Sequence, residues 1–385
     1  MTPGATVSTT PEESARATAA QLHGIADDLA GLPFRDAWKV LLAAPPVASV
    51  MESSLRERRA GAVLDAVSVL EGVGLAGVPP GLCYALTSQV FGIQWPLSEL
   101  DSRPLAPYLD GIRDGSLILC HALTEDAGGS DPLSMSTVVE DGANGQQLTG
   151  RKAYVTAAPR ADVILTFART SPGRHPFALS ALLIPANRPG VSRSEPFDKL
   201  AVPEVPMGAV EFGGVDVGPA DFVAAEGSGL ALLSTTTTWE RALLMSYAVG
   251  IMQRTLDRAV DWTRSRHQFG RALGASPLVA SRVADMAVAV HRVRTAVHGL
   301  AARIDAPTAS VSSFVTPAAM VKISCAQDLM DFEMTAGRLF GVRSVIEGSG
   351  HTAATASALA ASIYAGANDL LRVGIARDLG LPVEN

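Results

Sequence analysis

Residues 148–170 read LTGRKAYVTAAPRADVILTFART, and this stretch decides the fold class. Two runs rich in β-branched and aromatic residues, Leu148–Thr156 and Val163–Thr170, stand on either side of a short Ala-Pro segment, which is typical of two strands joined by a turn. No helical signal separates the runs of this kind, so we predict an antiparallel sheet or small barrel and not βαβ units. The other runs are Leu117–Leu123, Ala178–Pro185 and Ala209–Val217.

Both flanks of this β region carry helical signals. The N-terminal flank reads as helices that end or kink at prolines, because proline lacks the amide donor that continues a helix. In the C-terminal flank, apolar residues between Val279 and Leu300 alternate steps of four and three, which places one stripe along a helix face. We predict an α+β chain with a disordered tail (1–10), an N-terminal helical domain (11–116), a central β domain (117–228) and a C-terminal helical bundle (229–385).

Composition narrows the class of protein. The 385 residues include 48% hydrophobic side chains, enough for a sizeable core, and the net charge of −7 argues against a nucleic-acid partner, which requires a basic face. We expect no membrane span, because no apolar run approaches the roughly 18 residues that one requires. The opening residues MTPGATVSTTPEESA do not read as a signal peptide. The expected location is the cytoplasm.

Cysteine, histidine and lysine usage gives little sign of special chemistry. The 3 cysteines and 7 histidines lack the spacing of a disulfide framework or a metal site, so we expect no metal. Four of the basic residues are lysine, which we attribute to the codon usage of a GC-rich bacterial genome. These are Lys39, Lys152, Lys199 and Lys322.

Residues 72–77, GVGLAG, match the G-x-G-x-x-G pattern of dinucleotide-binding proteins. That pattern requires a strand before it and a helix N-terminus after it, which would hold the pyrophosphate. Here residues 54–71 look helical and Pro79–Pro80 follows. We therefore predict a loop between helices and no nucleotide site.

Three short motifs carry a resemblance to a known family. They are Leu123–Asp131 (LTEDAGGSD), Gly150–Thr156 (GRKAYVT) and Arg266–Gly270 (RHQFG), and Arg241 and Ala284–Met286 (ADM) add to them. Their order and spacing across about residues 100 to 290 resemble the acyl-CoA dehydrogenase family. The resemblance implies that the chain has the family fold, in which a helical domain, a central antiparallel β-barrel and a C-terminal four-helix bundle follow one another.

The resemblance also implies FAD as the cofactor. Backbone donors and hydroxyls would hold the flavin ring, with Tyr154 covering one face and Thr156 near its N5 atom. Other residues would meet the adenosine diphosphate of a neighbouring subunit's FAD, which implies a homo-oligomer, a dimer or a tetramer. The matching FAD-binding residues are Leu123, Thr124, Gly129, Ser130, Tyr154, Val155, Thr156, Arg266, Gln268, Phe269 and Gly337.

The family's reaction requires a carboxylate that removes the proton α to a thioester carbonyl, in a site dry enough to raise its pKa. The family usually carries this glutamate in a Y-E-G motif, where this sequence has Tyr364-Ala365-Gly366. A minority, including isovaleryl-type and long-chain enzymes, carries it just before the third-domain arginine, which corresponds to Glu240 before Arg241. We predict Glu240 as the base, with Arg241, Tyr364, Ala365 and Gly366 at the substrate.

Two further features depart from the family pattern. Glu240 has an alternative interpretation, as a glutamate in the first turn of a helix that the helix dipole stabilises. The family's Q-x-x-G-G-x-G stretch reads EMTAGRL at residues 333–339. A carboxylate at Glu333 would repel pyrophosphate unless Arg338 or another cation offsets it.

The predicted function is FAD-dependent dehydrogenation of an acyl-CoA or acyl carrier protein thioester, in a bacterial secondary-metabolite pathway. An electron-transfer flavoprotein is the expected acceptor. The bond oxidised could be γ,δ instead of α,β, since an existing alkene transmits the acidity of the carbonyl. Two alternatives are a flavin monooxygenase on the same scaffold and a non-catalytic subunit that binds FAD or thioester.

Overall fold

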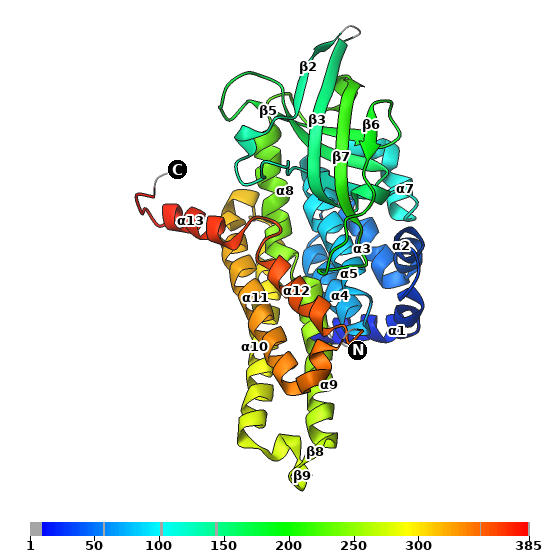
Figure 1. Cartoon of the computed structure of the whole chain (residues 1–385). Coiled ribbons are helices and arrows are strands. Elements are labelled where there is room, and N and C mark those ends of the chain that lie inside the picture. The colour runs from blue at the N-terminus through cyan, green and yellow to red at the C-terminus, as the bar shows by residue number, and fades with distance from the viewer. Residues whose placement is uncertain (1–9, 57, 101–102, 143–144, 347, 384–385) are drawn as a thin grey trace, which may run out of the picture.

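The computed structural model describes residues 10–56, 58–100, 103–142, 145–346 and 348–383. Figure 1 shows a sheet at one end of the molecule, N-terminal helices below it on one side, and long C-terminal helices on the other. Buried residues from all three parts form one continuous core. The predicted tail over 1–10 lies, apart from Thr10, outside the described residues.

The N-terminal part is helical, and prolines begin its helices. Pro45 and Pro80 occupy the first turns of their helices, where the missing amide costs no hydrogen bond. The segment after α5 is a π-helix, η1, whose chain then continues as α6. The elements are α1 (Pro11–Leu29), α2 (Phe34–Ala43), α3 (Pro45–Ser54), α4 (Ala62–Ala76), α5 (Pro80–Gln89), η1 (Val90–Gln94), α6 (Trp95–Leu100), η2 (Arg103–Tyr108) and α7 (Leu109–Arg113).

The central sheet contains the predicted strands but not the predicted antiparallel barrel. Its strand order is β1-β4-β2-β3-β7-β6, with β5 paired to β4. Strands β1 and β2 both run parallel to β4, so the sheet is mixed. The strands are β1 (Leu119–Ala122), β2 (Val138–Gly142), β3 (Gly145–Thr156), β4 (Val163–Arg169), β5 (Leu179–Pro185), β6 (Val191–Arg193) and β7 (Met207–Val217).

The connection between β1 and β4 explains this error. Parallel neighbours require a crossover of a dozen or more residues, which is usually a helix. Here the antiparallel β2–β3 hairpin lies within the connection and returns the chain to the start of β4. The lack of a helical crossover therefore did not exclude parallel pairing.

Four long helices dominate the C-terminal part. Helix α10 packs on α9 and α11, and α11 also packs on α8. On α10, the predicted stripe is buried from Met286 to Leu300, whereas Val279 and Val283 are half-exposed. The elements are α8 (Gly229–Leu243), α9 (Ser246–Ser265), β8 (His267–Gln268), β9 (Arg271–Ala272), α10 (Pro277–Ile304), α11 (Val311–Phe340), α12 (His351–Ala361) and α13 (Asn368–Asp378).

The predicted loop at residues 72–77 is wrong, because α4 continues through Ala76 and ends at Gly77. The glycines serve helix packing instead. A Cβ on Gly72 would lie 2.5 Å from the Ala15 carbonyl oxygen on α1, and one on Gly74 would overlap the Tyr247 carbonyl oxygen on α9. On the facing helix, a Cβ on Gly250 would overlap the backbone of Glu71. The small residues thus allow α4 to contact α1 and α9 closely.

Gly250→Ala is expected to lower the free energy of unfolding by about 3 kcal/mol, at the upper end of the usual cost of overpacking, because backbone atoms on both sides must move. Gly24→Ala on α1 is the matched control, since Gly24 is exposed and nothing lies within 4 Å of an added Cβ. It should raise stability by about 0.5–1 kcal/mol. Urea unfolding measures both, and equal stabilities would contradict the close helix contact.

Candidate active site

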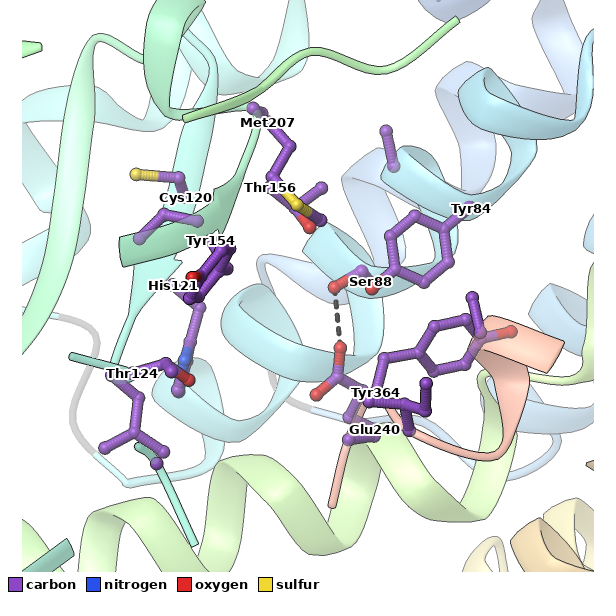
Figure 2. A pocket seen from close by; sticks show the side chains of 18 of the residues that line it. Tyr84, Ser88, Cys120, His121, Thr124, Tyr154, Thr156, Met207, Glu240 and Tyr364 are labelled. Carbon is purple, nitrogen blue, oxygen red and sulfur yellow. Dashed lines mark hydrogen bonds between the residues drawn. The ribbon is translucent and has the colours of Figure 1, made fainter. Parts of the chain in front are cut away.

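A cavity of about 780 Å³ lies between the sheet and the helices. In Figure 2, Thr124, Tyr154 and Thr156 come from the sheet side, and Ser88, Glu240 and Tyr364 come from helical segments opposite them. The cavity brings together most of the predicted site residues. Those that line it are Leu123, Thr124, Gly129, Ser130, Tyr154, Val155, Thr156, Glu240, Arg241, Tyr364, Ala365 and Gly366.

A buried ion pair holds the sheet side of the cavity. Lys152 on β3 is fully buried, and its Nζ lies 3.0 Å from Oε1 of Glu125 in the loop after β1. The backbone amides and hydroxyls of Ser136 and Thr137 also donate to this carboxylate, at 2.6–2.9 Å. Burial raises the pKa of Glu125, but these hydrogen bonds outweigh it and bring the pKa to about 2. The loop that carries Thr124, Gly129 and Ser130 is thereby fixed to the sheet.

The same side offers a flat, partly open surface. Tyr154 has a left-handed backbone (φ 57°), and its side chain is 59% exposed. Pairing between β3 and β7 is irregular between Lys152 and Val155, which accompanies this turn of the strand. A Cβ on Gly129 would lie 2.6 Å from the Thr124 hydroxyl, so the backbone approaches that hydroxyl closely. An exposed aromatic ring beside backbone groups and hydroxyls fits a planar ring such as that of a flavin.

Glu240 is the acidic group of the helical side. It lies near the end of α8, which begins at Gly229, so the alternative interpretation as a first-turn glutamate is wrong. Its Oε1 accepts a hydrogen bond of 2.7 Å from the Ser88 hydroxyl on α5 (Figure 2). Burial raises the pKa of Glu240, and the Ser88 hydrogen bond and the charges of Arg241 and Lys322 offset part of that rise. A Cβ on Gly92, in the π-helix η1, would lie 3.3 Å from the carboxyl carbon.

Two cations hold the loop between α12 and α13, where the usual glutamate of the family is replaced by Ala365. Arg241 Nε donates to the Ala365 carbonyl at 2.6 Å. Lys322 on α11 is fully buried, and its Nζ donates to the Gly366 carbonyl at 2.8 Å and to the Asn368 side chain at 2.7 Å. Burial, followed by repulsion from Arg241, lowers the pKa of Lys322 to about 7. The loop backbone is therefore fixed from behind.

Several lining residues escaped the motif-based analysis. Tyr84 and Ser88 on α5 and His121 on β1 line the cavity. His121 Nε2 lies 3.3 Å from the Thr236 hydroxyl, and burial lowers the pKa of His121 to about 4, so the ring is neutral at pH 7. Ser88 is separated from Glu240 by 152 residues, and no local pattern connects the two.

Four predicted residues lie away from this cavity. Arg266, Gln268 and Phe269 belong to the exposed turn of β8 and β9, and the Phe269 side chain is 100% exposed. Gly337 lies on α11, where a Cβ would lie 2.5 Å from Nε2 of His351. Their predicted contact with the FAD of a neighbouring subunit stays a prediction.

Glu333, one turn before Gly337, is buried. Its Oε2 lies 3.7 Å from Nδ1 of His351, and burial raises the pKa of Glu333 to about 7, although Arg258 opposes that rise. A half-protonated carboxyl repels phosphate less than a carboxylate does. The predicted electrostatic conflict at this position is therefore smaller than the sequence suggests.

Among the residues that the structure describes, no group of three or more His, Cys, Asp or Glu side chains could hold a metal ion. Within the same ranges, no helix has both the length and the apolarity needed to cross a membrane.

Comparison with known families agrees with the motifs. Residues 120–215 match the model of the acyl-CoA dehydrogenase middle domain, and residues 227–380 match that of the acyl-CoA dehydrogenase C-terminal domain. The chain therefore belongs to the acyl-CoA dehydrogenase family of flavoprotein oxidoreductases, which use FAD and act on CH–CH bonds.

Named relatives extend over most of the chain. An L-prolyl-[peptidyl-carrier protein] dehydrogenase of Serratia sp. (strain ATCC 39006) is 27% identical over 83% of this chain and 82% of its own length. A cyclohex-1-ene-1-carbonyl-CoA dehydrogenase of Geobacter metallireducens is 29% identical over 70% of each chain.

The fold itself matches solved structures. The prolyl acyl carrier protein oxidase AnaB superimposes with a TM-score of 0.87 at 24% identity, over 97% of this chain and 100% of AnaB. The structure described as PigA with FAD and proline gives a TM-score of 0.86 at 23% identity, over 99% of this chain and 100% of PigA.

Proposed function

We propose that this protein is an FAD-dependent dehydrogenase of a carrier-bound acyl thioester, and that Glu240 removes the proton. The observation that carries this proposal is the buried Glu240 carboxylate, which faces the flavin-compatible side of the cavity and has a raised pKa. The relatives named for peptidyl-carrier proteins, which align over most of the chain, support a carrier protein over CoA.

Each residue of the cavity has a physical task in this reaction. Glu240 accepts the proton from the carbon beside the thioester carbonyl, and burial brings its pKa closer to neutral pH. The Ser88 hydroxyl orients the carboxylate, while Arg241 fixes the backbone opposite it. Leu123, Thr124, Gly129, Ser130, Tyr154, Val155 and Thr156 would hold the FAD. When bound, FAD supplies the acceptor for the hydride.

The same groups serve γ,δ-dehydrogenation when the substrate already carries an α,β-alkene, because conjugation makes the γ-hydrogen acidic. We also propose that the protein acts as a homo-oligomer, in which Arg266, Gln268, Phe269 and Gly337 meet a neighbouring subunit's FAD. The full exposure of Phe269 supports this proposal. An electron-transfer flavoprotein is the proposed acceptor.

Anaerobic titration of the FAD-loaded protein tests the proposed function. Aminoacyl and saturated acyl thioesters of carrier protein and CoA, and their α,β-unsaturated forms, are added one at a time. We expect bleaching of the flavin band and a product two hydrogens lighter by mass spectrometry. No bleaching with any thioester, together with flavin reduction by NAD(P)H and oxygen consumption, would favour a monooxygenase.

Ser88→Ala is expected to move the acid limb of the pH profile of kcat/KM to higher pH by roughly one unit, since a hydrogen bond to a charged group contributes about 1.5–3 kcal/mol. The hydroxyl favours the ionised carboxylate, so its loss raises the pKa of Glu240 further, and less of the base is ionised at a given pH. Ser234→Ala, at an exposed position of α8, is the control. An unmoved acid limb would mean that Ser88 does not tune the base.

A further inference from the structure

Three tyrosines stand where the active-site cavity meets a second cavity. The second cavity has a volume of about 760 Å³ and lies among α9, α11 and α12. Tyr84 and Tyr364 line the active-site cavity, Tyr247 lines the second, and Val202 lines both. We call Tyr84, Tyr247 and Tyr364 the tyrosine wall; Figure 2 shows two of its members, Tyr84 and Tyr364, side by side next to Glu240.

The tyrosine wall is tightly packed. The rings of Tyr84 and Tyr364 lie 4.8 Å apart, and Tyr84 meets Tyr247 edge to face at 6.4 Å. The hydroxyls of Tyr247 and Tyr364 are 3.3 Å apart, within hydrogen-bond distance. Tyr84 and Tyr247 are 6% and 4% exposed. Aromatic pairs in such geometries gain energy beyond the area that they bury, so the wall is stable as it stands.

The wall draws its side chains from separate parts of the fold. Tyr84 comes from α5, Tyr247 from α9 and Tyr364 from the loop between α12 and α13. That loop is itself held by Arg241 and Lys322. Burial keeps the pKa of all three hydroxyls above 10, so they carry no charge at neutral pH. An acyl chain would meet a closed, neutral surface with polar hydroxyls, and not an open apolar channel.

The volume of the active-site cavity sets the scale. Its 780 Å³ would have to hold the flavin ring as well as the thioester and acyl group. Drug-sized ligands alone occupy pockets of roughly 300–1,000 Å³. Little depth is therefore left beyond Glu240 unless the second cavity becomes continuous with the first.

We propose that the tyrosine wall is the chain-length stop of this enzyme: it restricts the substrate to a short, compact acyl group, and Tyr247 separates the acyl pocket from the second cavity. This inference rests on the proposed function. Removal of the Tyr247 ring would join the two cavities and admit a longer chain.

Equilibrium binding to the FAD-loaded Glu240→Gln protein tests the inference without turnover. S-acyl pantetheines from propanoyl to dodecanoyl serve as probes, because CoA and carrier proteins share this arm. The flavin spectrum reports binding. We expect dodecanoyl pantetheine to bind at least ~10-fold more weakly than butanoyl, a discrimination that a shaped apolar pocket can supply. Equal affinities would overturn the proposal.

Addition of Tyr247→Ala is expected to reduce this preference at least ~10-fold by strengthening dodecanoyl binding. Ile251→Ala lines the second cavity but not the wall, and it should leave the preference unchanged. If Tyr247→Ala fails to fold, Tyr247→Leu replaces it. An unchanged preference in a folded, flavin-loaded Tyr247 variant would overturn the wall. No binding of any chain length would reject the proposed function itself.

Discussion

Glu240→Gln is expected to lower thioester-driven flavin reduction by at least ~10²-fold, because general-base catalysis typically contributes that much or more. The amide keeps the shape of the side chain but cannot take up the proton. The protein should still fold and bind FAD, since the residues assigned to FAD lie on the sheet side of the cavity or at the β8–β9 turn and Gly337. Stopped-flow bleaching under anaerobic conditions measures the rate.

The control is Glu226→Gln, at an exposed position in the loop before α8. It makes the same chemical change outside the cavity and should leave the rate as it was. If Glu240→Gln bleaches as fast as the parent while its flavin content is normal, Glu240 is not the proton acceptor. The membership of the family would survive that result, because it does not depend on this residue.

Lys152→Met is expected to lower the free energy of unfolding by about 3–5 kcal/mol, which is the usual cost of removing one partner of a buried ion pair. Glu125 would remain buried with a pKa of about 2 in the intact protein, so it would keep its charge or take up a proton at a cost. The loop with Thr124, Gly129 and Ser130 would loosen. We therefore expect FAD affinity to fall together with stability.

Arg151→Met provides the comparison on the same strand. Arg151 forms an ion pair with Asp126, but both side chains are largely exposed (41% and 62%), so its loss should not shift the urea midpoint measurably. Flavin fluorescence gives the FAD dissociation constant for both variants. Similar midpoints for the two would show that the buried pair adds nothing to stability.

The sequence predicted the sheet side of the site well, for a physical reason. Thr124, Gly129 and Ser130 lie within a few residues of one another, and Tyr154 and Thr156 lie on the next long strand. The Glu125–Lys152 pair explains why those two motifs belong together. Glu240 and Arg241 were identified through their fixed distance to a later motif, and both line the cavity.

The helical side was harder to predict, because its contacts join distant segments. Ser88, Tyr84 and Tyr247 carry no local signature, and their partners are more than 100 residues away. The scarcity of lysine was the one available signal for Lys322. In a chain that favours arginine, two of the four lysines are fully buried and form specific hydrogen bonds. We had attributed their rarity to codon usage alone.

The π-helix η1 has a consequence for how this chain tolerates changes of length. The Trp95 amide bonds to the Val90 carbonyl, five residues back, so this turn holds one residue more than an α-helical turn. A single-residue deletion here would restore α-helical winding and rotate α5 against α6 by roughly 100°. Ser88 would then turn away from Glu240. A one-codon deletion would thus abolish the contact without altering any residue that makes it.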